Sequence, residues 1–146
     1  MSYPFKKILC PVQFEDSEQT ALALAVQMAK DMDATVYLLH IVQNMQAIDA
    51  PDNAAGAADV EQEARLKLQK MADEMLAGLK SESLTRLAAP AETSRVLLEA
   101  AAQIDADLIV LKTHGRHGLA HFIMGSVAEQ VVRRARCPVL TLTSTD

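Results

Sequence analysis

The sequence predicts a single α/β domain, residues 1–146, built on a doubly wound five-stranded parallel sheet with helices on both faces. Apolar strand-like segments alternate with helical patterns along the whole chain, which is typical of a parallel sheet. The segment ATVYLLHIV at 34–42 is apolar on both faces, as buried parallel strands are. A length of 146 residues suffices for one domain with a full core.

The chain begins with an expected strand and helix. Lys7–Val12 predicts the first strand, which should end near Pro11 because proline cannot donate to a central ladder. A turn then leads into a helix over 18–32 that is rich in alanine and leucine. Asp16 or Ser17 is the expected N-cap of this helix, since both side chains can accept from free backbone N–H groups.

Residues 43–59 interrupt the alternation. They hold Pro51, Gly56 and two asparagines, and they predict an irregular connection or flap. A long helix over 60–79 follows, and its apolar stripe consists of Val60, Ala64, Leu68, Ala72 and Leu76. The rest of the chain predicts an edge strand at 83–88, a helix from Glu92 or Thr93 to Ile104, a strand at 107–111, a helix from Ser126 and a last strand, Pro138–Thr143.

A glycine-bearing segment, Lys112–Ser126 (KTHGRHGLAHFIMGS), joins the strand 107–111 to the helix that follows. It has no acidic residue, in a chain whose net charge is −5. Free backbone N–H groups and the positive end of a helix face such a loop, so this order can hold a phosphate. With strand order 3-2-1-4-5, the loops after strands 1 and 4 flank one crevice at the carboxyl ends, where such sheets bind ligands.

The segment from Leu111 to Leu140, together with KKILCPV near the start and LLHIV in the second strand, resembles the universal stress protein family over the whole chain. The glycine segment is similar to the family's ATP-binding motif, G-x2-G-x9-G-S/T, with Gly115, Gly125 and Ser126 in its last places. The resemblance implies a Rossmann-like fold and a cytoplasmic homodimer. It also implies ATP as the ligand, with Mg²⁺ only as carried by the nucleotide.

The resemblance also implies which residues hold the nucleotide. Gly115, Gly125, Ser126 and Val127 would cradle the triphosphate and ribose, and Ile41 would border the adenine. Together with the two loops that flank the crevice, the expected nucleotide-binding residues are Pro11, Val12, Gln13, Ile41, Leu111, Lys112, Thr113, His114, Gly115, Arg116, Gly125, Ser126 and Val127.

The chain departs from the family pattern at this crevice. Lys112 stands in the place of the first motif glycine, Gln13 in that of an acidic residue, and Ala128 where a second hydroxyl often sits. The Lys112 stem could fill the crevice and exclude the ribose, or lie along the wall so that its ammonium reaches a phosphate. We favour the second, because a side chain at an exposed strand end has room to turn outward.

Homodimerisation is expected through Pro138–Thr143. This segment alternates apolar and hydroxyl residues, and a strand at the edge of a sheet is a template for pairing. The alternative to a nucleotide-binding module is a ligand-free dimeric scaffold that binds an unidentified partner protein, which Lys112 and Gln13 favour. An enzyme of related fold would need a glycine-bearing phosphate loop after the first strand, and QFEDS has none. No general base is evident, so at most slow ATP hydrolysis is expected.

The amino-acid composition argues against several other functional classes. The net charge of −5 and the lack of tryptophan disfavour a nucleic-acid binder. No apolar run approaches the ~18 residues of a membrane span, and the N-terminus lacks the pattern of a signal peptide. Cys10 and Cys137 are expected at opposite ends of the sheet, too far apart for a disulfide.

The histidines invite a metal interpretation. His114, His117 and His121 have spacings of three and four, but no carboxylate or cysteine nearby completes a site, and no metal is expected. His40 lies in an apolar strand and is interpreted as a hydrogen-bonded core residue.

Overall fold

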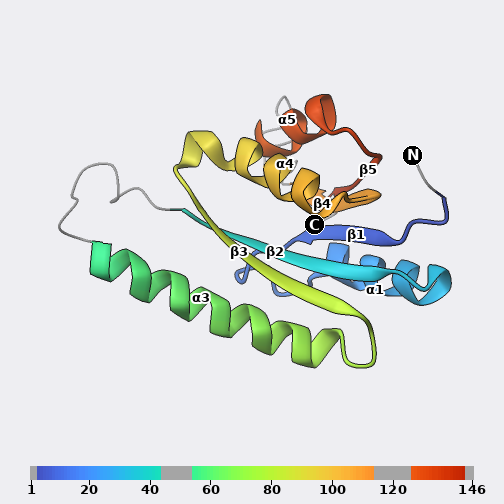
Figure 1. The fold of residues 1–146 in the computed structure, drawn as a ribbon, viewed down its shortest axis with the longest axis horizontal. Coiled ribbons are helices and arrows are strands. Elements are labelled where there is room, and N and C mark those ends of the chain that lie inside the picture. The colour runs from blue at the N-terminus through green and yellow to red at the C-terminus, as the bar shows by residue number, and fades with distance from the viewer. Residues whose placement is uncertain (1–2, 44–53, 114–125, 144–146) are drawn as a thin grey trace.

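The computed structural model describes residues 3–43, 54–113 and 126–143 (Figure 1). Strands and helices alternate along these ranges, as the sequence predicts. The elements are β1 (Lys7–Pro11), α1 (Thr20–Met32), β2 (Thr35–Gln43), α3 (Ala54–Met75), β3 (Ser81–Ala88), the 3₁₀ turn η2 (Pro90–Glu92), α4 (Thr93–Ile104), β4 (Leu108–Thr113), α5 (Ser126–Arg134) and β5 (Val139–Thr143).

The sheet has five parallel strands in the order β3-β2-β1-β4-β5, which confirms the predicted topology. Strands β3 and β5 lie at its edges, so the predictions for 83–88 and 138–143 are confirmed in place. The order reverses between β1 and β4, because β2 and β3 extend to one side of β1 while β4 and β5 extend to the other. A crevice forms at such a reversal, beyond the carboxyl ends of the strands.

Two hydrophobic cores cover the two faces of the sheet. Helices α1 and α3 pack over one face, and α4 and α5 pack over the other (Figure 1). Consecutive residues of β1 serve different faces: Ile8 and Cys10 belong to the first core, and Leu9 to the second. Both cores therefore arise from the period of two along the central strands, which are apolar on each side.

Helix α3 departs from the sequence prediction at both ends. It begins at Ala54, inside the segment expected to be irregular, and it ends at Met75 rather than 79. Its expected stripe is confirmed at Ala64, Leu68, Ala72 and Leu76, which are buried, but Val60 is 51% exposed. The first turns of α3 run past the end of the sheet in Figure 1. The period alone could not reveal this.

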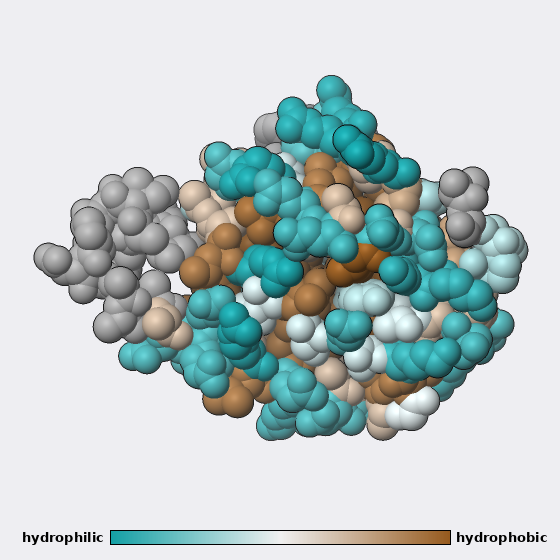
Figure 2. All heavy atoms as spheres, viewed as in Figure 1, coloured by the Kyte–Doolittle hydropathy of each residue, from teal (hydrophilic) through white to brown (hydrophobic). Residues whose placement is uncertain are grey.

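The surface follows from the two cores. Hydrophilic side chains cover most of the face seen in Figure 2, and apolar residues show between α4 and α3, next to the edge strand β3. Leu87 on this strand is partly exposed. No helix among the described residues is long and apolar enough to cross a membrane.

Both cysteines are free thiols, as predicted. Cys10 is fully buried in β1, and burial raises the pKa of its thiol to about 12. Burial, and then the nearby Asp107 carboxylate, also raise the pKa of Cys137. Neither thiol is a thiolate nucleophile at neutral pH, because the thiolate is the reactive form.

Candidate functional site

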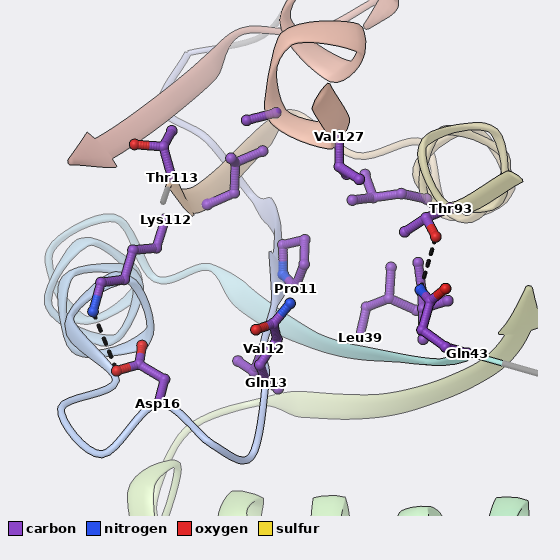
Figure 3. A pocket seen from close by; sticks show the side chains of 14 residues that line it. Pro11, Val12, Gln13, Asp16, Leu39, Gln43, Thr93, Lys112, Thr113 and Val127 are labelled. Atoms are coloured by element: carbon purple, nitrogen blue, oxygen red, sulfur yellow. Dashed lines mark hydrogen bonds and ion pairs between the residues drawn. The ribbon is translucent and has the colours of Figure 1, made fainter. Parts of the chain in front are cut away.

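A cavity of about 330 Å³ opens at the carboxyl ends of β1, β2 and β4, on the side of the sheet that α4 and α5 cover (Figure 3). Aliphatic side chains from five different elements form most of its wall. Polar side chains stand at its two ends. The lining residues are Pro11, Val12, Gln13, Asp16, Leu39, Ile41, Gln43, Thr93, Leu97, Leu111, Lys112, Thr113, Val127 and Ala128.

Most of the predicted site residues that the structure describes meet in this cavity. They come from three places in the sequence and are Pro11, Val12, Gln13, Ile41, Leu111, Lys112, Thr113 and Val127. Ser126 is the first residue of α5. His114, Gly115, Arg116 and Gly125 lie outside the described residues, as do His117 and His121 of the metal interpretation.

Several lining residues were not predicted. Leu39 lies on β2 two residues before Ile41, and Gln43 ends this strand. Thr93 and Leu97 come from the first turns of α4, a helix that was predicted from the sequence without any site residue on it. Ala128 also lines the cavity, as does Asp16, which was interpreted as a helix cap. Its position directly after β1 was the signal, because the sheet topology brings that whole loop to the crevice.

The loop between β1 and α1 is held by Gln19. The predicted cap at Asp16 or Ser17 is wrong: Gln19 is the N-cap, in the left-handed conformation with φ 49°. Its buried side-chain amide donates to the backbone carbonyls of Gln13 and Asp16, each at 2.7 Å. A left-handed backbone is costly for a residue other than glycine, so these two hydrogen bonds offset a local strain.

His40 supports the same loop from β2. Its Nδ1 lies 3.0 Å from the carbonyl oxygen of Val12, and its ring stacks on Phe14 with centroids 4.1 Å apart. The predicted hydrogen bond of His40 is thereby confirmed, but His40 is half-buried at the end of the core and not fully inside it. The backbone N–H of Val12 also donates to the carbonyl of Leu39 at 2.8 Å, which extends the β1–β2 pairing into the cavity wall.

One end of the cavity carries an ion pair. The Lys112 ammonium lies 3.2 Å from Asp16 Oδ1, and the two side chains are only 20% and 21% exposed (Figure 3). Burial alone would raise the pKa of the Asp16 carboxyl. The hydrogen bond from Lys112 and those from the backbone of Glu18 and Gln19 outweigh burial and hold this pKa below its ordinary value. Asp16 is therefore ionised at neutral pH.

The other end carries a neutral hydrogen bond. The Gln43 amide donates to Thr93 Oγ1 at 2.8 Å, and Thr93 in turn donates to the carbonyl of Pro90 at 3.1 Å (Figure 3). This bond ties the end of β2 to the start of α4 across the cavity mouth. Between the two polar ends lie Leu39 and Val127 with the other aliphatic residues. The arrangement suits an elongated ligand with an apolar middle and polar groups at its ends.

The described residues offer no cluster of three or more histidine, cysteine or acidic side chains that could hold a metal ion. The aliphatic wall and the polar groups at the ends of the cavity indicate a site that binds an organic molecule by shape and hydrogen bonding. Its most chemically distinct feature is the single charged pair at one end.

The sequence is similar to those of universal stress proteins. The model of the universal stress protein family matches residues 4–142. A universal stress protein of Methanocaldococcus jannaschii is 34% identical over 144 residues, which cover 94% of this chain and 82% of that protein.

Solved structures of the same family share the fold. One from Burkholderia pseudomallei has a TM-score of 0.75 and 26% identity, covering 99% of this chain and 100% of that chain. A universal stress protein in complex with cAMP has a TM-score of 0.68, with 23% identity and coverage of 97% and 98%. One from Archaeoglobus fulgidus in complex with dAMP has a TM-score of 0.65, with 22% identity and coverage of 93% and 96%.

Proposed function

The chain belongs to the universal stress protein family, and on that premise we propose that it is an adenine-nucleotide-binding regulatory module of the stress response, acting as a cytoplasmic homodimer. The observation that carries the proposal is the cavity where the strand order reverses. Its volume of about 330 Å³ falls within the range of small-molecule sites, ~300–1,000 Å³.

The shape of the cavity supports a nucleoside. Leu39, Ile41 and Leu97 offer an apolar surface for a base, and Gln43 and Thr93 at its margin offer hydrogen-bonding groups. Lys112 at the other end is a cation, as a phosphate requires. The related structures in complex with cAMP and dAMP support adenine as the base. ATP is the nucleotide that the glycine segment predicts, with Gly115, Gly125 and Ser126 around its phosphates and Mg²⁺ only as its companion.

Two measurements test the proposal. Mass spectrometry of small molecules released from freshly purified protein should detect an adenine compound. Titration calorimetry should then show binding of adenosine and AMP, with guanosine and GMP as matched controls that bind more weakly. If no adenine compound is released and none binds, the proposed function is wrong.

The ion pair supports a second candidate. The Lys112 ammonium is already paired with the Asp16 carboxylate, which leaves it less available to a phosphate. The chain could therefore serve as a ligand-free dimeric scaffold for a partner protein. The same calorimetry separates the candidates, since a scaffold would bind neither adenosine nor AMP. Catalysis is not part of the proposal, because Asp16, the carboxylate that lines the cavity among the described residues, is held in an ion pair by Lys112.

The dimer is proposed through β5. This strand lies at the edge of the sheet. Val139–Leu142 are half-buried, and no strand among the described residues pairs with their outer side. A strand edge of this kind pairs readily with a second copy. Light scattering at micromolar concentration should give twice the monomer mass for the wild type and a lower mass for Leu140→Pro, which removes a backbone donor. A monomeric wild type would contradict the proposal.

A further inference from the structure

The cavity holds one cation and one anion among the side chains described around it, and they are bonded to each other. Lys112 Nζ and Asp16 Oδ1 are 3.2 Å apart, and each side chain is about four-fifths buried. The side chains that line the described wall therefore sum to no net charge. A ligand phosphate that reaches Lys112 must compete with a carboxylate that is already there.

The Asp16 carboxylate is already held in a position where it competes with a ligand phosphate for the Lys112 ammonium. Its Oδ1 also accepts the backbone N–H of Glu18 at 3.1 Å. Its own backbone is fixed on both sides, since its N–H donates to Gln13 at 3.2 Å and its carbonyl accepts the Gln19 amide at 2.7 Å. A carboxylate held in this way gives up little further conformational entropy when it pairs with Lys112. Its position also persists when the ammonium leaves, so it stays beside any anion that takes its place.

We propose that Asp16 sets the charge selectivity of the nucleotide site: by holding the Lys112 ammonium, it disfavours ligands in proportion to the negative charge of their phosphates and favours adenosine and monophosphates over ADP and ATP. A phosphate that displaces Asp16 gains the ammonium but leaves a partly buried carboxylate unpaired next to it. The penalty rises with each charge on the phosphate chain. The inference rests on the proposed function for the adenine part of the ligand.

The experiment compares wild type with Asp16→Asn. Asparagine keeps an oxygen that can accept from Glu18 N–H, and removes the charge. Glu15→Gln is the matched control, because Glu15 is an exposed acid in the same loop that does not line the cavity. Titration calorimetry at low salt uses adenosine, AMP, ATP and inorganic tripolyphosphate as probes.

Asp16→Asn should bind ATP and tripolyphosphate about tenfold more tightly, AMP a fewfold more tightly and adenosine unchanged. Glu15→Gln should change all four affinities by less than about twofold, since its charge is screened by solvent. The gain in affinity for ATP and tripolyphosphate should vanish in the double variant that carries both Asp16→Asn and Lys112→Met. Equal gains in both single variants would mean long-range electrostatics and would overturn the inference, as would an unchanged ratio of ATP to adenosine affinity.

Tripolyphosphate separates this inference from the proposed function. If adenosine fails to bind but Asp16→Asn, and not Glu15→Gln, binds tripolyphosphate more tightly, the proposal of an adenine ligand is wrong. The inference that Asp16 sets the charge selectivity of the site then stands. If adenosine binds and phosphate affinities do not move, the proposed function stands and the inference falls. A second test uses the wild type alone and so does not depend on the folding of a variant. Carboxyl-carbon NMR should show that the pKa of Asp16 rises when ATP binds and does not change when adenosine binds. An identical pKa in both complexes would overturn the inference.

Discussion

In the part of the molecule that the structure describes, a groove and a cavity lie at opposite ends of the sheet, and the cavity, the smaller of the two, is the candidate site. The groove at the amino ends of β4 and β5 measures about 660 Å³, and the cavity at the carboxyl ends about 330 Å³. Charged side chains line the groove together with small apolar residues, and the charged ones include Arg95 of α4, Arg134 of α5 and Arg136 just beyond α5. The cavity is lined mainly by aliphatic residues, with a polar pair at each end.

The charges near the groove already serve the fold. Arg95 pairs with Glu92 and Glu99 on the surface of α4. Asp107 accepts the backbone N–H groups of Lys6 and Lys7 at 2.9 and 3.0 Å, which holds the start of β1 against β4. The comparison teaches that volume alone does not mark a ligand site. An apolar wall with a few converging polar groups does, because it combines burial with orientation.

The largest expected effect comes from filling each hollow in turn. Val127→Phe adds bulk at a cavity-lining position and should weaken adenosine binding about a hundredfold, equivalent to about 2.7 kcal/mol. Ala102→Phe adds a larger side chain to the groove and should leave the affinity unchanged. Titration calorimetry measures both, with circular dichroism to confirm folding. Equal adenosine affinity in the two variants would break the comparison.

The groove end should matter for stability instead. Asp107→Ala removes the acceptor of two backbone N–H groups and should lower the free energy of unfolding by about 2 kcal/mol. Adenosine affinity should change by less than about twofold, because the cavity lies at the other end of the strands. Urea unfolding supplies the first value and calorimetry the second. Asp31→Ala, at an exposed position on α1, is the control and should change neither.

Gln19 offers a sharper test within the cavity loop. Gln19→Ala and Gln19→Gly both delete the amide that bonds to Gln13 and Asp16. Glycine tolerates φ 49° and alanine does not, so the glycine variant should be the more stable by about 1 kcal/mol. Chemical denaturation of the pair measures this difference. If alanine were the more stable, the left-handed backbone at this position would not be strained.

The smallest effect is the dependence of stability on pH. The pKa of the Asp16 carboxyl is lower in the folded protein than its ordinary value. Its pairing therefore stabilises the fold fully above the unfolded pKa of ~3.9 and is lost as pH falls through the folded pKa. The free energy of unfolding of the wild type should exceed that of Asp16→Asn by at most about 1 kcal/mol from pH 7 to about 5. This difference should vanish in stronger acid.

Unfolding of both proteins across this range measures the effect, with Glu15→Gln as the control for an exposed acid in the same loop. A difference that grows toward low pH would have the wrong sign. It would mean that Asp16 is more easily protonated in the folded protein, and that Lys112 does not hold it as an ion.

The residue pattern of a single strand or helix was sufficient to predict features that depend on that element alone. The continuous apolar run of β2 predicted a strand with two buried faces, and its residues in the two cores confirm it. The hydrogen bond of His40 was predicted correctly, because a lone histidine in an apolar strand needs only one partner. Helix limits were less predictable: Val60 fits the stripe of α3, but whether sheet surface lies beneath it depends on the length of neighbouring strands.

The sequence by itself determined the strand–helix alternation, the family and the ends of β1 and β4 as parts of the crevice. Only the tertiary structure decided the charge of the site, because Asp16 and Lys112 are 96 residues apart in the chain. Each is an ordinary charged residue in its own segment. They pair because β1 and β4 are neighbours in the sheet, and because Gln19 turns the loop so that the carboxylate faces the end of β4. A local pattern cannot encode such a contact, since it depends on the order of strands in space.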